Sequence, residues 1–463
     1  MIADLEPYPR YEDSGHDWMG SVPDHWERLR AKYLFREVDE RSSTGKEELL
    51  SVSHLTGVTP RRLKSVTMFL AESNVGHKIC RPGDAVINTM WAWMGALGVS
   101  RHAGIVSPAY GVYRPIATER LLPAFADYLL RTPLYAAEYQ RRSTGVNSSR
   151  LRLYPEQFLR IPVLLPPMAE QTAIVRFLDW ANGRLERAIR AKRKVIALLD
   201  EQKQAIVHHA VTRGLNPIAP LKPSGVSWLG DVPQHWSLKK FKFVATITSG
   251  QIDPRRPEYR HLVLIAPNHI QTSSGKLLGR ETADEQGANS GKYVVAQGQV
   301  VYSKIRPNLR KATIAPCDCL CSADMYPIAP NLAELSSDYL LVLLLSQPFT
   351  KFAVDMSMRV AMPKVNREAL GVAVMWYPPQ KEQALILDFV AQECRPIDRA
   401  ISRLEREIEL FLEYRTRIVA DAVTGKLDVR NVAAWLPNEV PNGTLEDVDL
   451  TYDAESIDEE TIS

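Results

Sequence analysis

The chain of 463 residues lacks the short motifs that bind nucleotides or carry out catalysis. Its Gly-Lys pairs are followed by Glu, Leu, Tyr and Leu, so none completes a phosphate-binding loop of the G-x-x-x-x-G-K-[ST] type. It also lacks an H-E-x-x-H zinc motif, a G-x-S-x-G nucleophile motif, a glycine-rich cofactor loop, and the Asn/Asp-Pro-Pro-aromatic run of an amino-methyltransferase. We therefore expect no catalytic residue, no cofactor and no metal in this chain.

Cysteine is scarce, with five residues in the whole chain, which is too few and too clustered for a disulfide framework. Three of them, Cys317, Cys319 and Cys321, alternate along the sequence. Alternation places side chains on one face of a strand, whereas zinc sites use gaps of about two to four residues and often a nearby His. The pattern favours a buried strand over a metal site.

Long hydrophobic runs are absent. The longest, Leu340 to Leu345, is far shorter than the roughly 20 residues that span a bilayer, and the N-terminal residues do not form a signal peptide. Hydrophobic residues nevertheless make up 45% of the chain, enough for substantial cores, and the length predicts about three domains. We expect a globular protein in the cytoplasm with no membrane partner.

Basic residues are missing from the C-terminal tail, residues 431–463, which contains nine acidic residues. The chain has 57 Lys and Arg and 54 Asp and Glu in total, so residues 1–430 contain 57 basic against 45 acidic residues. A net charge of +12 on this part of the chain fits a polyanionic partner. The tail has the composition of a disordered segment.

The sequence does contain a long internal repeat. Residues 166–214 recur from Pro378 at a constant shift of 212 positions, which pairs Glu170-Gln171 with Glu382-Gln383. A Trp-rich segment, Trp-x-Gly-x-Val-Pro-x-His-Trp, also occurs twice, starting at Trp18 and at Trp228. The chain is therefore two copies of one design, each with a Trp-rich segment, a variable body and a long helix.

Apolar residues in each long helix follow the alternating four-three spacing of a coiled-coil seam. Proline pairs precede both helices and a glycine follows each, as at helix boundaries. About 42 residues at roughly 1.5 Å each give a rod of roughly 60 Å, and we expect the two rods to pack on each other. The seam positions are Leu185, Ile189, Lys192, Ile196, Leu199, Lys203, Ile206 and Ala210 in the first helix, and Ile397, Ile401, Leu404, Ile408, Phe411, Arg415, Ile418 and Ala422 in the second.

Each variable body has a mixed pattern, and we predict an α/β fold for both. Residues 85–94 and 299–305 are rich in β-branched and aromatic residues and are predicted strands. Residues 125–140 and 337–352 are predicted helices, and a last strand should lead into each rod. The Trp-rich segments are expected to fix the bodies against the rods, and His25 and His235 are not expected to be catalytic.

These patterns predict two globular α/β domains separated by two long helices that pack as an antiparallel coiled coil. The expected boundaries are an N-terminal Trp-rich segment at 1–23, a first body at 24–165, a first helix at 166–214, a linker with the second Trp-rich segment at 215–233, a second body at 234–377, a second helix at 378–427, and an acidic, disordered tail at 428–463.

Basic and amide side chains gather in the variable bodies. Arg and Lys neutralise phosphates, and Arg with guanine or Asn and Gln with adenine form the paired hydrogen bonds that read base edges. On composition alone this is a weak signal, because charged loops are usually only solvated. The candidate DNA-binding residues are Arg61, Arg62, Lys64, Lys78, Asn88 and Trp91 in the first body, and Asn268, Gln271, Lys304, Arg306, Asn308, Arg310, Lys311, Arg359 and Lys364 in the second.

Several of these motifs, in this order, resemble a known family. They are LPPMAEQTAIVRFLD (165–179) with its copy YPPQKEQALILDFV (377–390), the Ala-Val-Thr ends of both helices, WLGDVPQHW (228–236), SGQIDP (249–254) and CSADMYPIAP (321–330). Together they resemble the specificity subunit of a type I DNA restriction-modification enzyme. The first body departs from this pattern, because it carries SVSHLTGV (51–58) in place of a SGQIDP-like run. This difference implies another subtype of recognition domain and another half-site.

The resemblance implies a non-catalytic subunit that reads double-stranded DNA. Each body would be a target-recognition domain for one half of an asymmetric, split target, and the helices would set the spacer and dock two modification subunits, which are adenine methyltransferases. S-adenosylmethionine, ATP and Mg would serve the modification subunits and the restriction subunits, which combine helicase and nuclease activities.

Two other functions fit the residues without the resemblance. The chain could be a coiled-coil scaffold whose variable bodies bind proteins, or a stand-alone nuclease or methyltransferase with an unrecognised active site. Salt separates the first alternative from DNA binding, because phosphate contacts make affinity fall steeply with ionic strength. An activity assay with added metal and cofactor tests the second.

Overall fold

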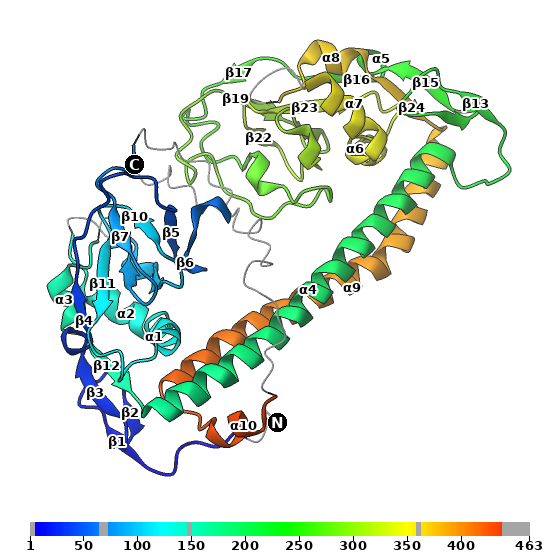
Figure 1. The fold of residues 1–463 in the computed structure, drawn as a ribbon. Helices are drawn as coiled ribbons and strands as arrows, with labels where there is room; N and C mark the ends of the chain where they lie inside the picture. The colour runs from blue at the N-terminus through cyan, green and yellow to red at the C-terminus, as the bar shows by residue number, and fades with distance from the viewer. Residues whose placement is uncertain (1–4, 64–72, 146–150, 358–362, 438–463) are drawn as a thin grey trace. The chain divides into compact units, whose positions relative to one another are not determined.

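The computed structural model describes residues 5–63, 73–145, 151–357 and 363–437 (Figure 1). The chain divides into two compact units, which are described separately. Unit 1 is formed by residues 1–192 and 406–463, and unit 2 by residues 193–405. Each unit therefore contains one variable body and part of both long helices.

The two predicted rods are α4, Met168–Arg213, and α9, Gln380–Val423. Each ends at the glycine that the sequence indicated, Gly214 or Gly425, with φ of 72° and 79°. Glycine adopts this left-handed conformation without steric cost and commonly ends helices. At Gly425 a side chain would also clash, because an added Cβ would lie 2.4 Å from Cδ of Pro23. Both helices lie within the ranges predicted for them, 166–214 and 378–427.

The predicted coiled-coil seam is also confirmed, since none of its sixteen positions is exposed. In unit 1 the polar seam residue Lys192 forms an ion pair with Glu407 of α9, with 2.5 Å between Nζ and Oε2. In unit 2 Lys203 pairs in the same way with Asp398, also at 2.5 Å. The helix segments run antiparallel in both units (Figure 1). Lysine is tolerated in this seam because each ammonium group has a carboxylate partner on the other helix.

The frame of the body is the same in both units. In each, a short strand after the Trp-rich segment pairs with the last strand before a long helix, β3 with β12 and β15 with β24. Each body then has a four-stranded antiparallel sheet, in the order β4-β11-β8-β9 or β16-β23-β20-β21. These pairings confirm the α/β prediction and the predicted last strands.

The bounds of the remaining elements follow. Unit 1 contains β1 (Tyr11–Asp13), β2 (Ser21–Pro23), β3 (Glu27–Arg30), β4 (Phe35–Glu37), β5 (Leu50–Ser53), β6 (Gly57–Pro60), β7 (Lys78–Cys80), β8 (Ala85–Ile87), β9 (Leu97–Val99), β10 (Gly104–Val106), β11 (Gly111–Pro115), α1 (Pro123–Leu130), α2 (Pro133–Arg142), α3 (Pro155–Leu159), β12 (Pro162–Leu165) and α10 (Arg430–Trp435). Unit 2 contains β13 (Leu221–Pro223), β14 (Asp231–Pro233), β15 (Ser237–Lys240), α5 (Phe241–Val244), β16 (Ala245–Ile247), β17 (Gln251–Ile252), β18 (Leu264–Ile265), β19 (Lys292–Val295), β20 (Val300–Ser303), β21 (Ala312–Ile314), β22 (Cys319–Cys321), β23 (Met325–Pro330), α6 (Ser337–Leu345), α7 (Gln347–Ser357), α8 (Arg367–Val372) and β24 (Val374–Tyr377).

The bodies differ beyond this shared frame. Unit 2 has a second four-stranded sheet, in the order β17-β19-β22-β18. The corresponding part of unit 1 forms two separate pairs of strands, β5 with β6 and β10 with β7. The SVSHLTGV run of the first body lies in the β5–β6 hairpin, whereas SGQIDP of the second body contributes β17. The two bodies therefore present different surfaces on the same frame.

Four local predictions are wrong. The strand predicted over 85–94 ends at Ile87 and is followed by a turn and the 3₁₀-helix Ala92–Met94. Each helix predicted near 125–140 and 337–352 is two helices, because Pro133 and Pro348 each start a new helix in the first turn, where proline is favoured. The predicted disordered tail is wrong for α10, while residues 438–463 lie outside the described residues.

Two of the three alternating cysteines lie in a buried strand, as the sequence predicted, whereas Cys317 lies in a bend before that strand. Cys319 and Cys321 are buried in one cluster with Ile265 and Val301, and Cys317 packs against it from the edge. Burial raises the pKa of the Cys319 thiol to about 12 and that of Cys321 further. Both buried thiols are therefore protonated at neutral pH and serve as small apolar side chains.

Within the described ranges, no single helix is both long and apolar enough to cross a membrane, although α6 and α7 pass that test together as a pair bent by 62°.

Candidate nucleic-acid interface

The repeated Glu-Gln pair at the start of each long helix holds the Trp-rich segment. In unit 1, Glu170 accepts hydrogen bonds from the indole Nε1 of Trp26 at 2.7 Å and from the hydroxyl of Tyr8 at 2.5 Å. Its other oxygen, Oε2, lies 2.9 Å from Nε2 of His25. The Glu170 side chain is only 4% exposed, so these partners replace most of its hydration. Burial, together with the bond to Glu170, raises the pKa of Tyr8.

The same contacts recur in unit 2, where Glu382 accepts from Nε1 of Trp236 at 3.1 Å and Nε2 of His235 lies 2.7 Å away. This second carboxylate is 26% exposed. The contacts confirm that the Trp-rich segments fix the bodies against the helices. Both motifs were visible in the sequence, but their contact with each other was not predicted. The signal for this contact was that Glu-Gln and His-Trp are repeated together.

The glutamine of each pair binds backbone atoms just before a helix of the body, α1 in unit 1 and α6 in unit 2. Gln171 accepts from N of Leu122 at 2.8 Å and donates to O of Arg120 at 2.8 Å. Gln383 accepts from N of Ser336 at 3.0 Å and donates to O of Glu334 at 2.7 Å. Each Glu-Gln pair therefore fixes its body to a long helix at two points, which provides a firm base for the variable loops.

The candidate DNA-binding residues of the first body differ in exposure. Arg62 is exposed, 3.5 Å from Glu48, and the half-exposed ring of Trp91 stacks on Trp93 with 6.2 Å between centroids. Lys78 and Asn88 are 8% exposed. Lys78 lies 3.6 Å from Asp39, and Asn88 donates to the hydroxyl of Tyr110 at 3.2 Å. Arg61 is half-buried, and Lys64 lies outside the described residues.

The candidates of the second body lie on three segments that are joined by hydrogen bonds. The amide of Ser273 donates to the carbonyl of Arg310 at 3.1 Å, and the amide of Arg306 donates to the carbonyl of Pro363 at 2.9 Å. The structure thus brings together residues 267–274, 304–311 and Lys364, which forms an isolated β-bridge with Ile305. Asn268, Gln271, Arg306, Asn308 and Lys364 are exposed there.

Three further candidates of the second body form hydrogen bonds within the protein. Nζ of Lys304 donates to the carbonyl of Ala323 at 2.5 Å, and Nζ of Lys311 donates to the carbonyl of Pro267 at 2.8 Å. The guanidinium of Arg310 contacts α4. Arg359 lies outside the described residues. Contact of these residues with DNA stays a prediction.

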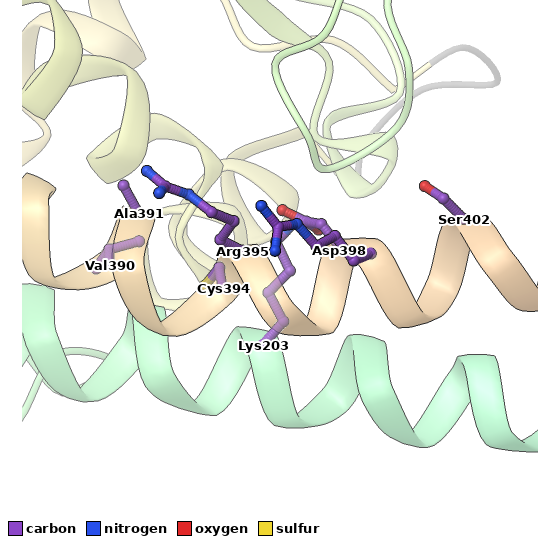
Figure 2. A pocket seen from close by; sticks show the side chains of 8 residues that line it. Lys203, Val390, Ala391, Cys394, Arg395, Asp398 and Ser402 are labelled. Atoms are coloured by element: carbon purple, nitrogen blue, oxygen red, sulfur yellow. The ribbon is translucent and has the colours of Figure 1, made fainter.

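A groove of about 630 Å³ that sequence analysis did not predict lies along α9 in unit 2 (Figure 2). Lys203 reaches it from α4, and Arg395, Asp398 and Arg399 line it from α9. Lys203 is paired with Asp398, which leaves a basic lining. Burial raises the pKa of Cys394, which also lines the groove and is a poor nucleophile in this state. No group of three or more His, Cys, Asp or Glu side chains is placed to hold a metal ion in the parts of the chain described.

No protein-family model matches the chain. The chain is 32% identical over 282 residues to the type I restriction enzyme EcoDI specificity subunit of Escherichia coli, an alignment that covers 58% of this chain and 62% of that protein. It is 22% identical over 335 residues to the type I restriction enzyme EcoKI specificity subunit of Escherichia coli strain K12, covering 68% of each.

A structural comparison agrees. A chain from a study of complex assembly and conformational transition of a type I restriction-modification system matches with a TM-score of 0.57 at 16% identity, over 88% of this chain and 99% of that one. The likeness at this identity concerns the fold. The chain spans about 62% of the length of the EcoDI subunit, so activity and partners are proposals. The predicted resemblance is nevertheless confirmed. The chain is related in sequence to the specificity subunits of type I restriction enzymes, and it shares the fold of a chain from a type I restriction-modification system.

Proposed function

We propose that this chain is the DNA sequence-recognition subunit of a type I restriction-modification complex and has no catalytic role of its own. The observation that carries the proposal is the pairing of two unlike bodies with one repeated frame. Both bodies are fixed to the long helices by the same Glu-Gln and His-Trp contacts, yet their outer strands differ. Two different recognition domains, attached to the helices in the same way, suit an asymmetric target with two different half-sites.

In this proposal the exposed side chains of each body read its half-site. Arg306 and Asn308 are the best placed in the second body. Both side chains are exposed in the loop 304–311, whose backbone is hydrogen-bonded to neighbouring segments. Arginine pairs with guanine through two hydrogen bonds, and asparagine pairs with adenine in the same way. Lys364 is suited to a phosphate contact, which adds affinity but no sequence preference.

The long helices would set the spacer between the half-sites and dock two modification subunits. Those subunits would flip the target adenine out of the duplex and methylate it with S-adenosylmethionine, which requires a pocket of their own. Restriction subunits would add ATP- and Mg-dependent translocation and cleavage. The exposed faces of α4 and α9 opposite the seam leave room for such docking.

Salt dependence tests the proposal. If the complex with a modification subunit contacts six or more phosphates, its affinity for the target duplex should fall by about a thousandfold between 50 and 200 mM salt. Lys364→Ala should flatten the slope of log affinity against log salt by about one unit on every sequence. Arg417→Ala, which removes an exposed cation of α9, is the matched control and should leave the slope unchanged.

The scaffold alternative makes the opposite prediction. A chain whose bodies bind proteins would show no selective affinity for duplex DNA, and the Lys364→Ala and Arg417→Ala variants would be indistinguishable. That result would overturn the proposed function.

A further inference from the structure

Backbone conformation singles out one place in the second body. Among the described residues, three residues other than glycine have a positive φ: Ser273 at 61°, Arg306 at 46° and Arg310 at 46°. Residues with a side chain rarely adopt this conformation, and it persists only where the surroundings hold it. All three belong to the two joined loops that contain the exposed candidates Arg306 and Asn308.

Hydrogen bonds show what holds these loops. Ser273 and Arg310, both with positive φ, are joined by the amide-to-carbonyl bond of 3.1 Å. Lys311 binds the carbonyl of Pro267 at 2.8 Å, and the hydroxyl of Thr313 binds the carbonyl of Gly275 at 2.8 Å. The loops 267–275 and 306–313 therefore form one connected piece, and a shift in one displaces the other.

A side-chain hydrogen bond ties this piece to a long helix. Nη1 of Arg310 donates to Oε1 of Gln204, on α4, at 2.9 Å. Arg310 is half-buried, and burial lowers its pKa. Its guanidinium is thus directed at the helix. Arg306, just before the 3₁₀ turn Pro307–Leu309, and Asn308, in the middle of that turn, are exposed. The two arginines of the loop have different surroundings, which their sequence does not indicate.

We propose that Gln204 is a positioning residue for recognition of the second half-site: by holding Arg310 it fixes the direction in which Arg306 and Asn308 meet the bases. The inference rests on the proposed function and adds a residue of the helix to the specificity machinery. A bidentate contact to a base needs both donors in register. A loop that can rotate therefore discriminates less between bases, although its positive charge still attracts the DNA. Arg310 is then a support for the reading residues.

The test compares three variants of the full chain in complex with a modification subunit. Gln204→Leu removes the acceptor at similar size, and Gln204→Glu keeps an acceptor for the guanidinium as a charged pair. Gln234→Leu alters an exposed glutamine of the same unit, outside the long helices, as the matched control. Selection from DNA libraries, randomised in one half-site at a time, measures base preference. We expect Gln204→Leu to lose about tenfold in discrimination at the second half-site, with preference at the first half-site unchanged and only a small decrease in the thermal midpoint. Gln204→Glu and Gln234→Leu should retain the native preference.

Three results would overturn the inference: native preference in Gln204→Leu, an equal loss at both half-sites, or a loss as large in Gln204→Glu. The wild-type chain separates this failure from failure of the proposed function. If wild type selects no sequence, the proposed function itself is wrong; if wild type is selective and Gln204→Leu matches it, only the role of Gln204 is wrong.

Discussion

A chain with one extra heptad in each long helix is expected to lose its native DNA target and to select one with the same two half-sequences and a longer spacer. Seven residues at about 1.5 Å each lengthen a helix by roughly 10 Å, which equals about three base pairs at roughly 3.4 Å each. Three base pairs also turn a half-site by about 100° around the duplex, given about 10 base pairs per turn. The native spacing should therefore no longer fit.

The seam indicates where to insert. Heptads placed after Leu198 and after Ser402 fall between the two cross-helix ion pairs, Lys192 with Glu407 and Lys203 with Asp398. A whole heptad keeps the four-three spacing, so both ion pairs and the seam are preserved. A heptad in α4 alone is the control, since it leaves the helices unequal in length. Selection from a library of randomised spacers measures the outcome, and recovery of the native spacing by the doubly extended chain would show that the helices do not set it.

Removing the carboxylate of Glu170 should destabilise the protein far more than removing its repeat counterpart. Glu170→Ala leaves the indole of Trp26 and the hydroxyl of Tyr8 without an acceptor in a buried site. Loss of a buried, charged acceptor costs about 3 to 5 kcal/mol. Glu382→Ala removes a carboxylate that is 26% exposed, where water can replace it, and should cost about 1 kcal/mol.

Denaturant unfolding of the full chain measures both changes. Glu170→Gln is the informative companion, because its amide oxygen can still accept from Trp26 while the charge is lost, and we expect a cost between those of the two alanine variants. Equal destabilisation by Glu170→Ala and Glu382→Ala would contradict this account of burial at the two sites.

The sequence predicted the long helices well and the bodies less well, for a physical reason. The seam of α4 and α9 repeats a local pattern many times, so the helix is predicted from many positions that agree. A short strand has no such redundancy. Residues 85–94 are rich in strand formers throughout, but only Ala85–Ile87 finds partners, in β9 and β11. Such pairing depends on distant residues.

The same limit applies to the candidate interface. Charge and amide content indicated the loop at 304–311, and its exposed residues Arg306 and Asn308 were among those predicted. The sequence could not tell these from Lys311 and Arg310, whose acceptors lie 44 and 106 positions away in the chain. Whether a cation faces solvent or supports a loop is decided by tertiary contacts that leave no local pattern.

Exchange of one body tests the central claim most directly. Residues 240–375 would be replaced by the equivalent segment of a relative with a different second body, leaving β12, both long helices and the Glu-Gln pairs intact. Selected target sequences of the native and exchanged chains, each in complex with a modification subunit, would then be compared. We predict that one half-site changes while the other half-site and the spacer stay the same. A change in both half-sites, or in neither, would contradict the assignment of one body to each half of the target.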